Sequence, residues 1–449
     1  MQKTADTIAA IATPPGIGGI SVVRVSGPAV AAIARQVIVD LPPPRRASLR
    51  SFRAPDASLL DEGVAIYFPA PASYTGEDVL ELQGHGGAVV AGEVLRSVVA
   101  AGARPARPGE FSERAFLGGR LDLAQAEAVA DLINSATAVA ARAAMRSLKG
   151  EFSKEIAVFN DKLEELRAYI EAAIDFPEEE IDFLSEGDVG RRLRQANCNL
   201  AILQNGTAQG ALLASGIQVA LAGRPNAGKS SLLNRLAGHD RAIVSDIAGT
   251  TRDVIHVTTQ IDGLRVELVD TAGLREGGDE IEAEGIRRAR HAVDEADLIL
   301  LIVDDECETA DEIAQSVAEL PTGTAAVVVR NKCDLSGRPA GPVSTCAQDT
   351  VSVSARTGAG MGALKRSITN GVGYRVDAEE PVMVRQRHIE AMASAQAHLR
   401  SAEQHAVQGL GELIAEDLRL SQRALGEITG TVTSEDLLGR IFASFCIGK

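Results

Sequence analysis

Hydrophobic and polar positions alternate over short distances in the first part of the chain. Up to about Phe116, brief apolar stretches are separated by turn-forming segments such as TPPGIGG at residues 13–19 and GHGG at residues 84–87. Short apolar runs between Gly- and Pro-rich turns are typical of strands. We therefore expect a mixed, sheet-containing domain here.

From Leu121 the chain becomes rich in Ala, Leu, Glu and Arg, and apolar residues recur at steps of three and four. The recurring positions are Met145, Leu148, Phe152, Ile156, Phe159, Leu163, Leu166 and Ile170. This spacing predicts one face of a long amphipathic helix, which most simply packs on other helices. A second stretch of the same composition follows the linker-like GVGYRVDAEEP at residues 371–381 and runs to the end.

Between these helical stretches the pattern changes to that of buried strands. Apolar runs occur in GIQVALAG, VELVD, LILLIVD and AAVVVRNK, and helix-like segments separate them. Such alternation indicates a parallel sheet with crossover helices. We expect a multidomain α+β and α/β chain with an N-terminal domain at residues 1–118, a helical domain in two pieces at 119–212 and 374–449, and an inserted α/β domain at 213–373.

Charge and composition narrow the class of protein. The 449 residues carry 45 Lys and Arg against 61 Asp and Glu, a net charge of -16, so any contact with RNA needs a local patch or a partner. The five cysteines show no CxxC pair, and the longest apolar run, Leu298 to Val303, is too short to cross a membrane. We expect a cytoplasmic protein with no membrane partner.

Residues 223–230, GRPNAGKS, fit the phosphate-binding pattern GxxxxGK[ST]. They follow a predicted strand and precede a predicted helix, and this context separates a P-loop from an unliganded Gly-rich turn. In a P-loop the backbone N–H groups surround the phosphates, Lys229 places its charge on the terminal phosphoryl group, and the Ser230 hydroxyl binds Mg²⁺.

Two further motifs follow in the order that a GTPase requires. DTAG at residues 270–273 ends a predicted strand, where the acid reaches Mg²⁺ through water; NKCD at residues 331–334 ends a later one. The carboxylate of Asp334 can accept hydrogen bonds from N1–H and the exocyclic amine of guanine, a pair of donors that adenine lacks. Alone, DTAG is also compatible with a loop and NKCD with a polar turn. Behind a P-loop, they indicate GTP.

The remaining nucleotide contacts come from the predicted switches and from the segment after VSV. Thr250 and Thr251 in GTTRD resemble a first switch, with a threonine completing the Mg²⁺ shell, and Ser354 and Ala355 stand where such proteins place a further guanine-contacting loop. The expected GTP contacts are Asn226, Ala227, Gly228, Lys229, Ser230, Ser231, Ser245, Asp246, Ile247, Ala248, Gly249, Thr250, Thr251, Asp270, Thr271, Ala272, Gly273, Asn331, Lys332, Asp334, Ser354, Ala355 and Arg356.

The residue after DTAG is Leu274, where many small GTPases have the glutamine that orients the attacking water. Glu282 is our candidate for that task and Lys229 the phosphate-binding catalytic residue. Without a family comparison, an exposed helix carboxylate would be the default interpretation of Glu282. No arginine is obviously placed in cis as a finger, although Arg252 and Arg275 are switch candidates. Alternatively, Asn226 and loop carbonyls at residues 245–250 hold a monovalent cation against the phosphates, which predicts hydrolysis stimulated by potassium.

Several longer segments carry a family resemblance. YTGEDVLELQGHGG at residues 74–87, RPGEFSERAF at 107–116, LDLAQAEAVADLI at 121–133 and the terminal FCIGK, together with the GTPase motifs, resemble the MnmE (TrmE) family of tRNA-modification GTPases. The resemblance runs from TPPGIGG to the last residue. It implies a folate-binding N-terminal domain, a helical bundle and an inserted Ras-like P-loop GTPase domain.

The resemblance also implies an activity and partners. Members of the family form homodimers through their N-terminal domains and work in a heterotetramer with the FAD-dependent protein MnmG. Together they add an aminomethyl or carboxymethylaminomethyl group to C5 of the wobble uridine of certain tRNAs, with methylene-tetrahydrofolate as the one-carbon source. GTP hydrolysis accompanies a potassium-dependent approach of the two GTPase domains.

Site residues carried over from the family are expectations of the same kind. The folate contacts are Arg24, Glu81, Arg120 and Lys449, and the potassium ligands are Asn226, Ser245, Ile247 and Thr250, with Ser230 and Thr251 on Mg²⁺. Arg120 replaces the common Lys, which keeps the charge but changes the donor geometry, and Ser245 replaces a common Thr. From composition alone, Arg24 fits a strand-edge arginine and Glu81 a solvent-facing strand residue.

Cys446 in the tail is a candidate for catalysis in the modification reaction. It stands beside small and cationic residues, where a thiolate is favoured. A prenylation box and a small buried hydrophobe are the alternatives, and the final Lys449 argues against the first. Cys198, Cys307, Cys333 and Cys346 are expected to be structural. The alternative function for the whole chain is a regulatory GTPase of ribosome assembly with the flanking domains as docking surfaces.

Overall fold

The chain folds into two compact units. The computed structural model describes residues 6–175, 188–238, 255–270, 293–344, 349–376 and 381–448. The first unit combines Met1–Ala130, Leu148–Leu193 and Ser394–Lys449, and the second combines Asp131–Ser147 with Arg194–Ala393. No helix among the described residues is long and apolar enough to cross a membrane.

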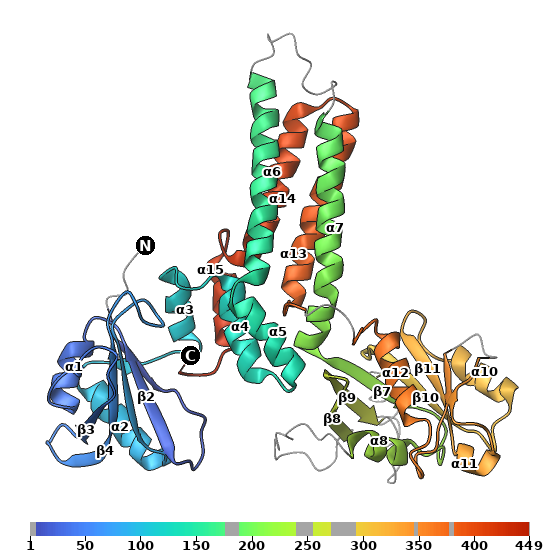
Figure 1. Ribbon diagram of the computed structural model, residues 1–449, viewed down its shortest axis with the longest axis horizontal. Helices are drawn as coiled ribbons and strands as arrows, with labels where there is room; N and C mark the ends of the chain where they lie inside the picture. The colour runs from blue at the N-terminus through green and yellow to red at the C-terminus, as the bar shows by residue number, and fades with distance from the viewer. Residues whose placement is uncertain are drawn as a thin grey trace, which may run out of the picture. The chain divides into compact units, whose positions relative to one another are not determined.

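The N-terminal part of the first unit is built on a six-stranded sheet (Figure 1). Its order is β3-β4-β5-β2-β1-β6, with bounds Ser48–Arg53, Leu59–Phe68, Val79–His85, Ile20–Ser26, Ile8–Ile11 and Arg104–Pro105. Helices α1 (Val30–Val37) and α2 (Ala88–Ala100) bury their apolar faces against it. The core combines strand residues with helix residues: Val23, Val25, Phe52, Leu80, Leu82, Ile33, Val37, Val94 and Val98. The expected mixed, sheet-containing domain is confirmed.

The predicted apolar face of the long helix is found on α6 for most, but not all, of its positions. Helix α6 (Glu151–Asp175) packs along α14 (Gly411–Thr429), and the predicted positions from Phe152 to Ile170 are buried in it. The other helices are α3 (Glu110–Leu117), α4 (Leu123–Asn134), α5 (Ala138–Leu148), α7 (Asp188–Ser215), α13 (Gln386–Val407) and α15 (Glu435–Ala443).

The prediction that Met145 to Ile170 lie on one helix is wrong. The helix is interrupted at Gly150, whose φ of 79° lies in the left-handed region. Helix α5 therefore ends at Leu148, and α6 begins at Glu151. A Cβ at Gly150 would lie 3.0 Å from the Gln125 side chain, so there is little room for another residue. Met145 consequently falls on α5, where the residue is 39% exposed.

The second unit contains a seven-stranded sheet in the order β12-β13-β11-β10-β7-β9-β8. The strands are Gly341–Pro342, Thr350–Ser352, Ala325–Asn331, Leu298–Asp304, Ile217–Ala222, Leu264–Asp270 and Ile255–Ile261. Pairs from β13 to β9 are parallel, as predicted, and the edge strands β12 and β8 are antiparallel. The helices that follow its strands are α8 (Lys229–Ala237), α10 (Ala310–Ala318), α11 (Cys333–Ser336) and α12 (Met361–Gly371).

Helix α5 also belongs to this second unit. Ala140, Ala143 and Ala144 join the buried cluster formed by the apolar side chains of β7, β9 and β10. Small side chains let a helix approach a sheet closely, so α5 is an integral part of this core.

The expectation that residues 371–381 form a linker is wrong in its first part. Tyr374 is 4% exposed, lies in the same core, and its hydroxyl donates to the Asp262 carbonyl at 3.3 Å. The aromatic ring supplies apolar area that the composition of the segment hid. Residues 377–380 lie outside the described part of the chain.

Candidate functional site

The predicted P-loop joins β7 to α8, and the strand-loop-helix context is confirmed. Gly223 has φ 135°, Asn226 66° and Gly228 95°, so the loop uses left-handed conformations that turn its backbone back on itself. A Cβ at Gly223 would lie 2.1 Å from the Ile302 carbonyl oxygen, which only glycine avoids. The loop therefore delivers its N–H groups to the N-terminus of α8, a favourable position for phosphate.

Lys229 is folded over this loop. Its side chain is buried, and its ammonium group donates to the carbonyl oxygens of Gly223 at 2.6 Å and Arg224 at 2.8 Å. These carbonyls hold the charge at the mouth of the loop, so the amine is positioned for a phosphate group. The geometry fits the role predicted for Lys229.

The two residues expected near Mg²⁺ lie together. The Ser230 hydroxyl donates to the Asp270 carboxylate at 3.2 Å, and Asp270, at the end of the neighbouring strand β9, is 2% exposed. Hydroxyl and carboxylate oxygens are the donors that Mg²⁺ prefers, so these residues fit the ion. Ser231 follows on the exposed side of the first turn of α8.

Asn331 connects three parts of the site. Its side-chain amide donates to the Ala227 carbonyl in the P-loop at 2.9 Å, and its side-chain oxygen accepts from the Ala355 N–H at 3.0 Å. Asn331 is 2% exposed, and a Cβ at Gly228 would lie 2.2 Å from its amide nitrogen. The P-loop, the NKCD segment and the segment after β13 are thus held in one arrangement.

Lys332 has a partner that the sequence analysis missed. Its φ is 66°, and its ammonium group forms an ion pair of 2.6 Å with the Asp304 carboxylate. Burial raises the pKa of the Asp304 carboxyl, but the hydrogen bond from Lys332 and others lower it, and the net pKa is below its ordinary value. Asp304 closes LILLIVD and stands opposite Asn331 in the β10–β11 register, so strand alignment is the signal that finds it.

Asp334, the predicted base-specifying acid, carries its negative charge. The hydrogen bond from Ser354 is the largest influence that lowers the pKa of Asp334, and Arg356, 2.8 Å away, lowers it further. Ser354 is fully buried, so its hydroxyl holds the carboxylate in place. The structure therefore brings together the predicted residues Asp334, Ser354 and Arg356 as an acceptor site suited to guanine.

Other predicted nucleotide and metal residues lie outside the described residues. They are Ser245, Asp246, Ile247, Ala248, Gly249, Thr250, Thr251, Thr271, Ala272, Gly273 and Glu282. Their roles stay predictions.

Two predicted folate contacts meet in the first unit. Arg24 of β2 and Glu81 of β5 are direct cross-strand partners, and the Arg24 Nε donates to Glu81 Oε1 at 3.1 Å. The guanidinium also lies over the rings of Tyr74, at 5.5 Å, and Phe111, at 5.8 Å, neither of which the sequence analysis selected. Their position in the family-like segments was the available signal. Arg24 is thus an ordered part of an aromatic-lined polar site.

The C-terminal tail reaches Arg24. The Gly448 carbonyl accepts from Arg24 Nη1 at 3.4 Å, and Gly448 has φ 99°, with the Ile11 carbonyl oxygen 2.6 Å from where a Cβ would stand. The Cys446 side chain is exposed, so the buried-hydrophobe alternative for it is wrong. Lys449 lies outside the described residues.

Arg120 is a predicted folate contact, and some of the remaining cysteines do not lie as the sequence predicted. Arg120 is exposed; its side chain passes 3.3 Å from where a Cβ at Gly76 would stand, and within the described residues no hydrogen bond or ion pair joins it to Arg24 or Glu81. Cys333 is buried, as a structural cysteine should be, whereas Cys198 and Cys307 are exposed. Cys346 lies outside the described part of the chain.

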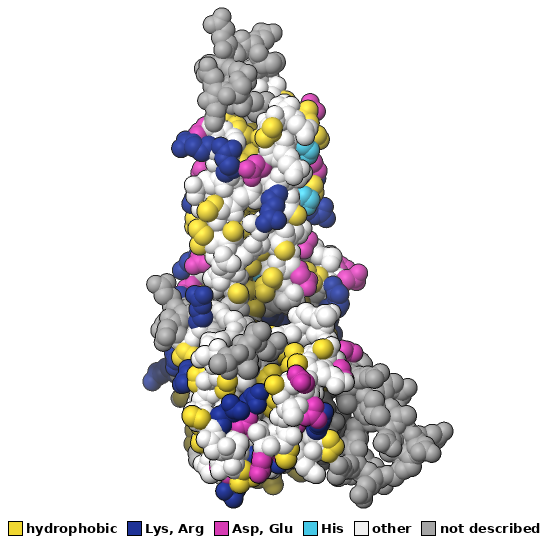
Figure 2. All heavy atoms as spheres, turned by 90° about the vertical axis from the view of Figure 1, so that its right-hand side faces the viewer, with side chains coloured by type: hydrophobic (Ala, Val, Ile, Leu, Met, Phe, Trp, Pro, Cys, Tyr) yellow, Lys and Arg dark blue, Asp and Glu magenta, His cyan; other side chains and the backbone are white. Residues whose placement is uncertain are grey.

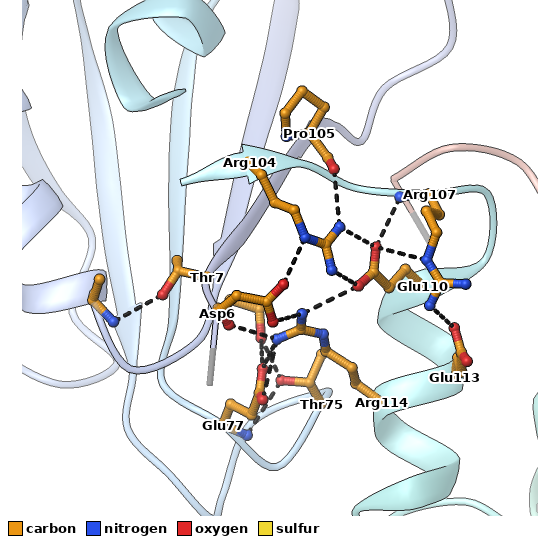
Figure 3. Close-up of polar contacts among 12 residues, drawn as sticks. Asp6, Thr7, Thr75, Glu77, Arg104, Pro105, Arg107, Glu110, Glu113 and Arg114 are labelled. Carbon is orange, nitrogen blue, oxygen red and sulfur yellow. Dashed lines mark hydrogen bonds and ion pairs between the residues drawn. The ribbon is translucent and has the colours of Figure 1, made fainter. Parts of the chain in front are cut away.

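An ion network centred on the buried Arg114 and Glu110 lies in the same unit as Arg24, and Figure 3 shows its side chains converging from α3, β6, the turn before β5 and the segment before β1. Arg114 pairs with Glu110, Glu77 and Asp6, and Arg104 adds a further pair to Glu110. Burial raises the pKa of Glu110, but hydrogen bonds from Arg104, the Arg107 N–H and Arg114 lower it to about 2. The network fixes α3, the helix that carries Phe111.

Comparison with known proteins agrees with this geometry. A family model described as the MnmE helical domain matches residues 123–446, and one described as the GTP-binding protein TrmE N-terminus matches residues 7–120. A crystal structure of Aquifex aeolicus Era bound to GDP·AlF4⁻ aligns over 40% of this chain and 66% of that chain, at 25% identity and a TM-score of 0.27, which is too low to carry an argument.

Full-length relatives carry the assignment. The tRNA modification GTPase MnmE of Stutzerimonas stutzeri (strain A1501) is 52% identical over 457 residues, covering 100% of both chains. That of Coxiella burnetii (strain Dugway 5J108-111) is 52% identical over 448 residues, covering 99% of each, and that of Proteus mirabilis (strain HI4320) is 50% identical over 454 residues, covering 100% of both. With the P-loop, the guanine-type acceptor site and the tail at Arg24 in place, the chain belongs to the MnmE (TrmE) family.

Proposed function

We propose that this chain is a GTP hydrolase that acts in the modification of tRNA. The observation that carries the proposal is the double hydrogen bond of Asn331, which holds the P-loop and the guanine-type acceptor site together. The role in tRNA modification is supported by relatives that match this chain over nearly its whole length and are named tRNA modification GTPase. Asp334 selects GTP, Lys229 binds its phosphates, and Ser230 with Asp270 holds Mg²⁺.

The finer chemistry rests on the family resemblance. We infer that the chain works as a homodimer in a heterotetramer with MnmG, whose FAD takes part, in the cytoplasm. The complex adds an aminomethyl or carboxymethylaminomethyl group to C5 of the wobble uridine. Arg24, Glu81, Arg120 and Lys449 hold the tetrahydrofolate derivative, which supplies the one-carbon unit when bound. The contact between Arg24 and the tail supports this part because it brings the segment of Cys446 to the same site.

Hydrolysis is proposed to depend on potassium. Asn226, with carbonyls of Ser245, Ile247 and Thr250, holds the ion; Thr251 completes the Mg²⁺ shell, and Glu282 orients the water. The left-handed backbone of Asn226 supports the first of these roles, because it turns the residue at the mouth of the loop. We further propose the domain boundaries 1–118, 119–212, 213–373 and 374–449, with Tyr374 packing back into the core of the inserted domain.

The test is mass spectrometry of tRNA nucleosides from cells that lack the gene, with and without the gene supplied on a plasmid. The account predicts loss of C5-aminomethyl-type uridines in the deletion and their return with the plasmid. Unchanged nucleosides, together with accumulation of unassembled ribosomal particles on sucrose gradients, would favour the alternative, a regulatory GTPase of ribosome assembly.

A further inference from the structure

A cavity of about 200 Å³ lies in the second unit, away from the residues of the nucleotide site. Its walls come from α5, from α7, from the turn between β8 and β9, and from the segment after α12. The side chains that matter are Arg142, Arg146, Arg375, Asp262, Gln209 and Tyr374. The activity proposed above gives none of them a task.

Charge distinguishes this cavity. Arg142 and Arg146 are one helical turn apart and share a face of α5, and Arg375 adds a third guanidinium; among the described lining residues, Asp262 is the one carboxylate that faces them. The lining is thus net positive in a chain whose net charge is -16. Among the described residues, no ion pair neutralises Arg142 or Arg375. The cavity can accept an anion without first breaking a salt bridge at these two side chains.

The frame of the cavity is fixed by the fold. Gln209 accepts from the Arg375 N–H at 2.8 Å and donates to the Gly373 carbonyl at 2.7 Å, and the buried Tyr374 is bonded to the Asp262 carbonyl. Asp262 and the next glycine have φ 50° and 88°, a tight hairpin turn that brings this tip against α5. A site built in advance binds without the cost of ordering its walls.

The chemistry of the lining selects the ligand. Guanidinium forks match the oxygens of phosphate in a bidentate way, and several around one cavity suit a singly or doubly charged phosphoryl group. Figure 2 shows acidic and basic side chains interspersed on the face that it draws, without a broad basic field. RNA binding by such a surface depends on local sites that neutralise individual phosphates.

We propose that this cavity takes a backbone phosphate of the RNA on which the protein acts. The inference rests on the proposed function, since it supplies a contact for tRNA that the nucleotide site does not provide. It makes Arg142, Arg146 and Arg375 positioning residues that set the RNA against the second unit.

The test uses the full chain with Arg142→Gln and Arg375→Gln together. Affinity for fluorescently labelled bulk tRNA is measured by anisotropy from about 50 to about 200 mM KCl. We expect several-fold weaker binding at low salt and a slope of log affinity against log salt that is smaller by about one. GTP hydrolysis without tRNA and the melting temperature should match the wild-type protein.

A matched control removes the same charge elsewhere. Arg35→Gln with Arg423→Gln changes two exposed arginines in the first unit. An equal loss in this control would show that bulk charge sets the affinity and would overturn the proposal. An unchanged slope in the cavity variant would overturn it as well.

Two further measurements distinguish an RNA phosphate in the cavity from other ligands. Titration calorimetry with pyrophosphate as the probe detects a free phosphate ligand; loss of that binding with unchanged tRNA affinity would assign the cavity to a small molecule and not to RNA. If the wild-type chain alone binds no tRNA, the inference falls, and the nucleoside assay then shows independently whether the proposed function stands.

Discussion

The side-chain amide of Asn331 donates a hydrogen bond of 2.9 Å to the backbone carbonyl of Ala227, 104 positions earlier in the chain. The same side chain accepts from the Ala355 N–H. One buried residue therefore sets the distance between the phosphate loop and the segment after β13. Parallel neighbours β7, β10 and β11 make this contact possible, because their carboxyl ends meet at one edge of the sheet.

Replacing Asn331 by Ala should weaken nucleotide binding and stability together. The change leaves the Ala227 carbonyl and the Ala355 N–H without a partner, which costs about 2 kcal/mol when such groups are buried. Urea unfolding and the affinity for a fluorescent GDP analogue measure the two effects. Unchanged GDP affinity in a folded variant would contradict the role given to this residue.

Asp334→Asn should change the base that is bound. The carboxylate accepts from guanine N1–H and its amine, whereas the amide pairs better with the carbonyl that xanthine carries at that position. We expect a large loss of GTP affinity and a gain for xanthosine triphosphate. Competition binding with the two triphosphates measures the exchange, and a loss of both affinities to the same degree would count against direct base recognition.

The ion network around Glu110 predicts acid sensitivity. The pKa of Glu110 falls from 4.5 to about 2, so its contribution to stability is present above about pH 4.5 and is lost as the pH falls toward 2. The shift corresponds to at most about 3 kcal/mol. Melting temperatures of the wild-type protein should fall more steeply over this range than those of Glu110→Gln. Parallel pH profiles would show that the network does not depend on this charge.

Gly448→Ala should separate the tail from Arg24. A Cβ there would lie 2.6 Å from the Ile11 carbonyl, and φ is 99°, so the tail has to move. We expect loss of tRNA modification in cells with GTP hydrolysis retained, since the affected contact lies in the first unit. Gly439→Ala on α15 is the control, because its Cβ would meet nothing within 4 Å. Equal activity of both variants would argue against a role for the tail position.

The strands of the second unit and the P-loop could be predicted because their signals are local. LILLIVD and AAVVVRNK are continuous buried runs, and GRPNAGKS has its strand and helix directly beside it. The helix break at Gly150 was not predicted because a helical pattern tolerates a single glycine. The positive φ of Gly150 and its close approach to the Gln125 side chain are visible only in the fold.

Polar contacts between residues far apart in the chain could not be predicted from the sequence. Glu110 and Arg114 stand four residues apart and invite pairing, but Asp6 and Glu77, the other partners of Arg114, are 108 and 37 positions away. Asp304 likewise pairs with Lys332 only because β10 and β11 are aligned side by side. These contacts follow from topology, which the spacing of apolar residues indicates only in outline.

Whether tRNA modification needs the nucleotide site can be measured in cells. In cells that lack the gene, plasmids supply either the wild-type chain or Lys229→Ala at matched protein level, and tRNA nucleosides are measured by mass spectrometry. We expect C5-aminomethyl-type uridines to return with the wild-type chain and to stay absent with Lys229→Ala. Full return of these nucleosides with Lys229→Ala would contradict this expectation.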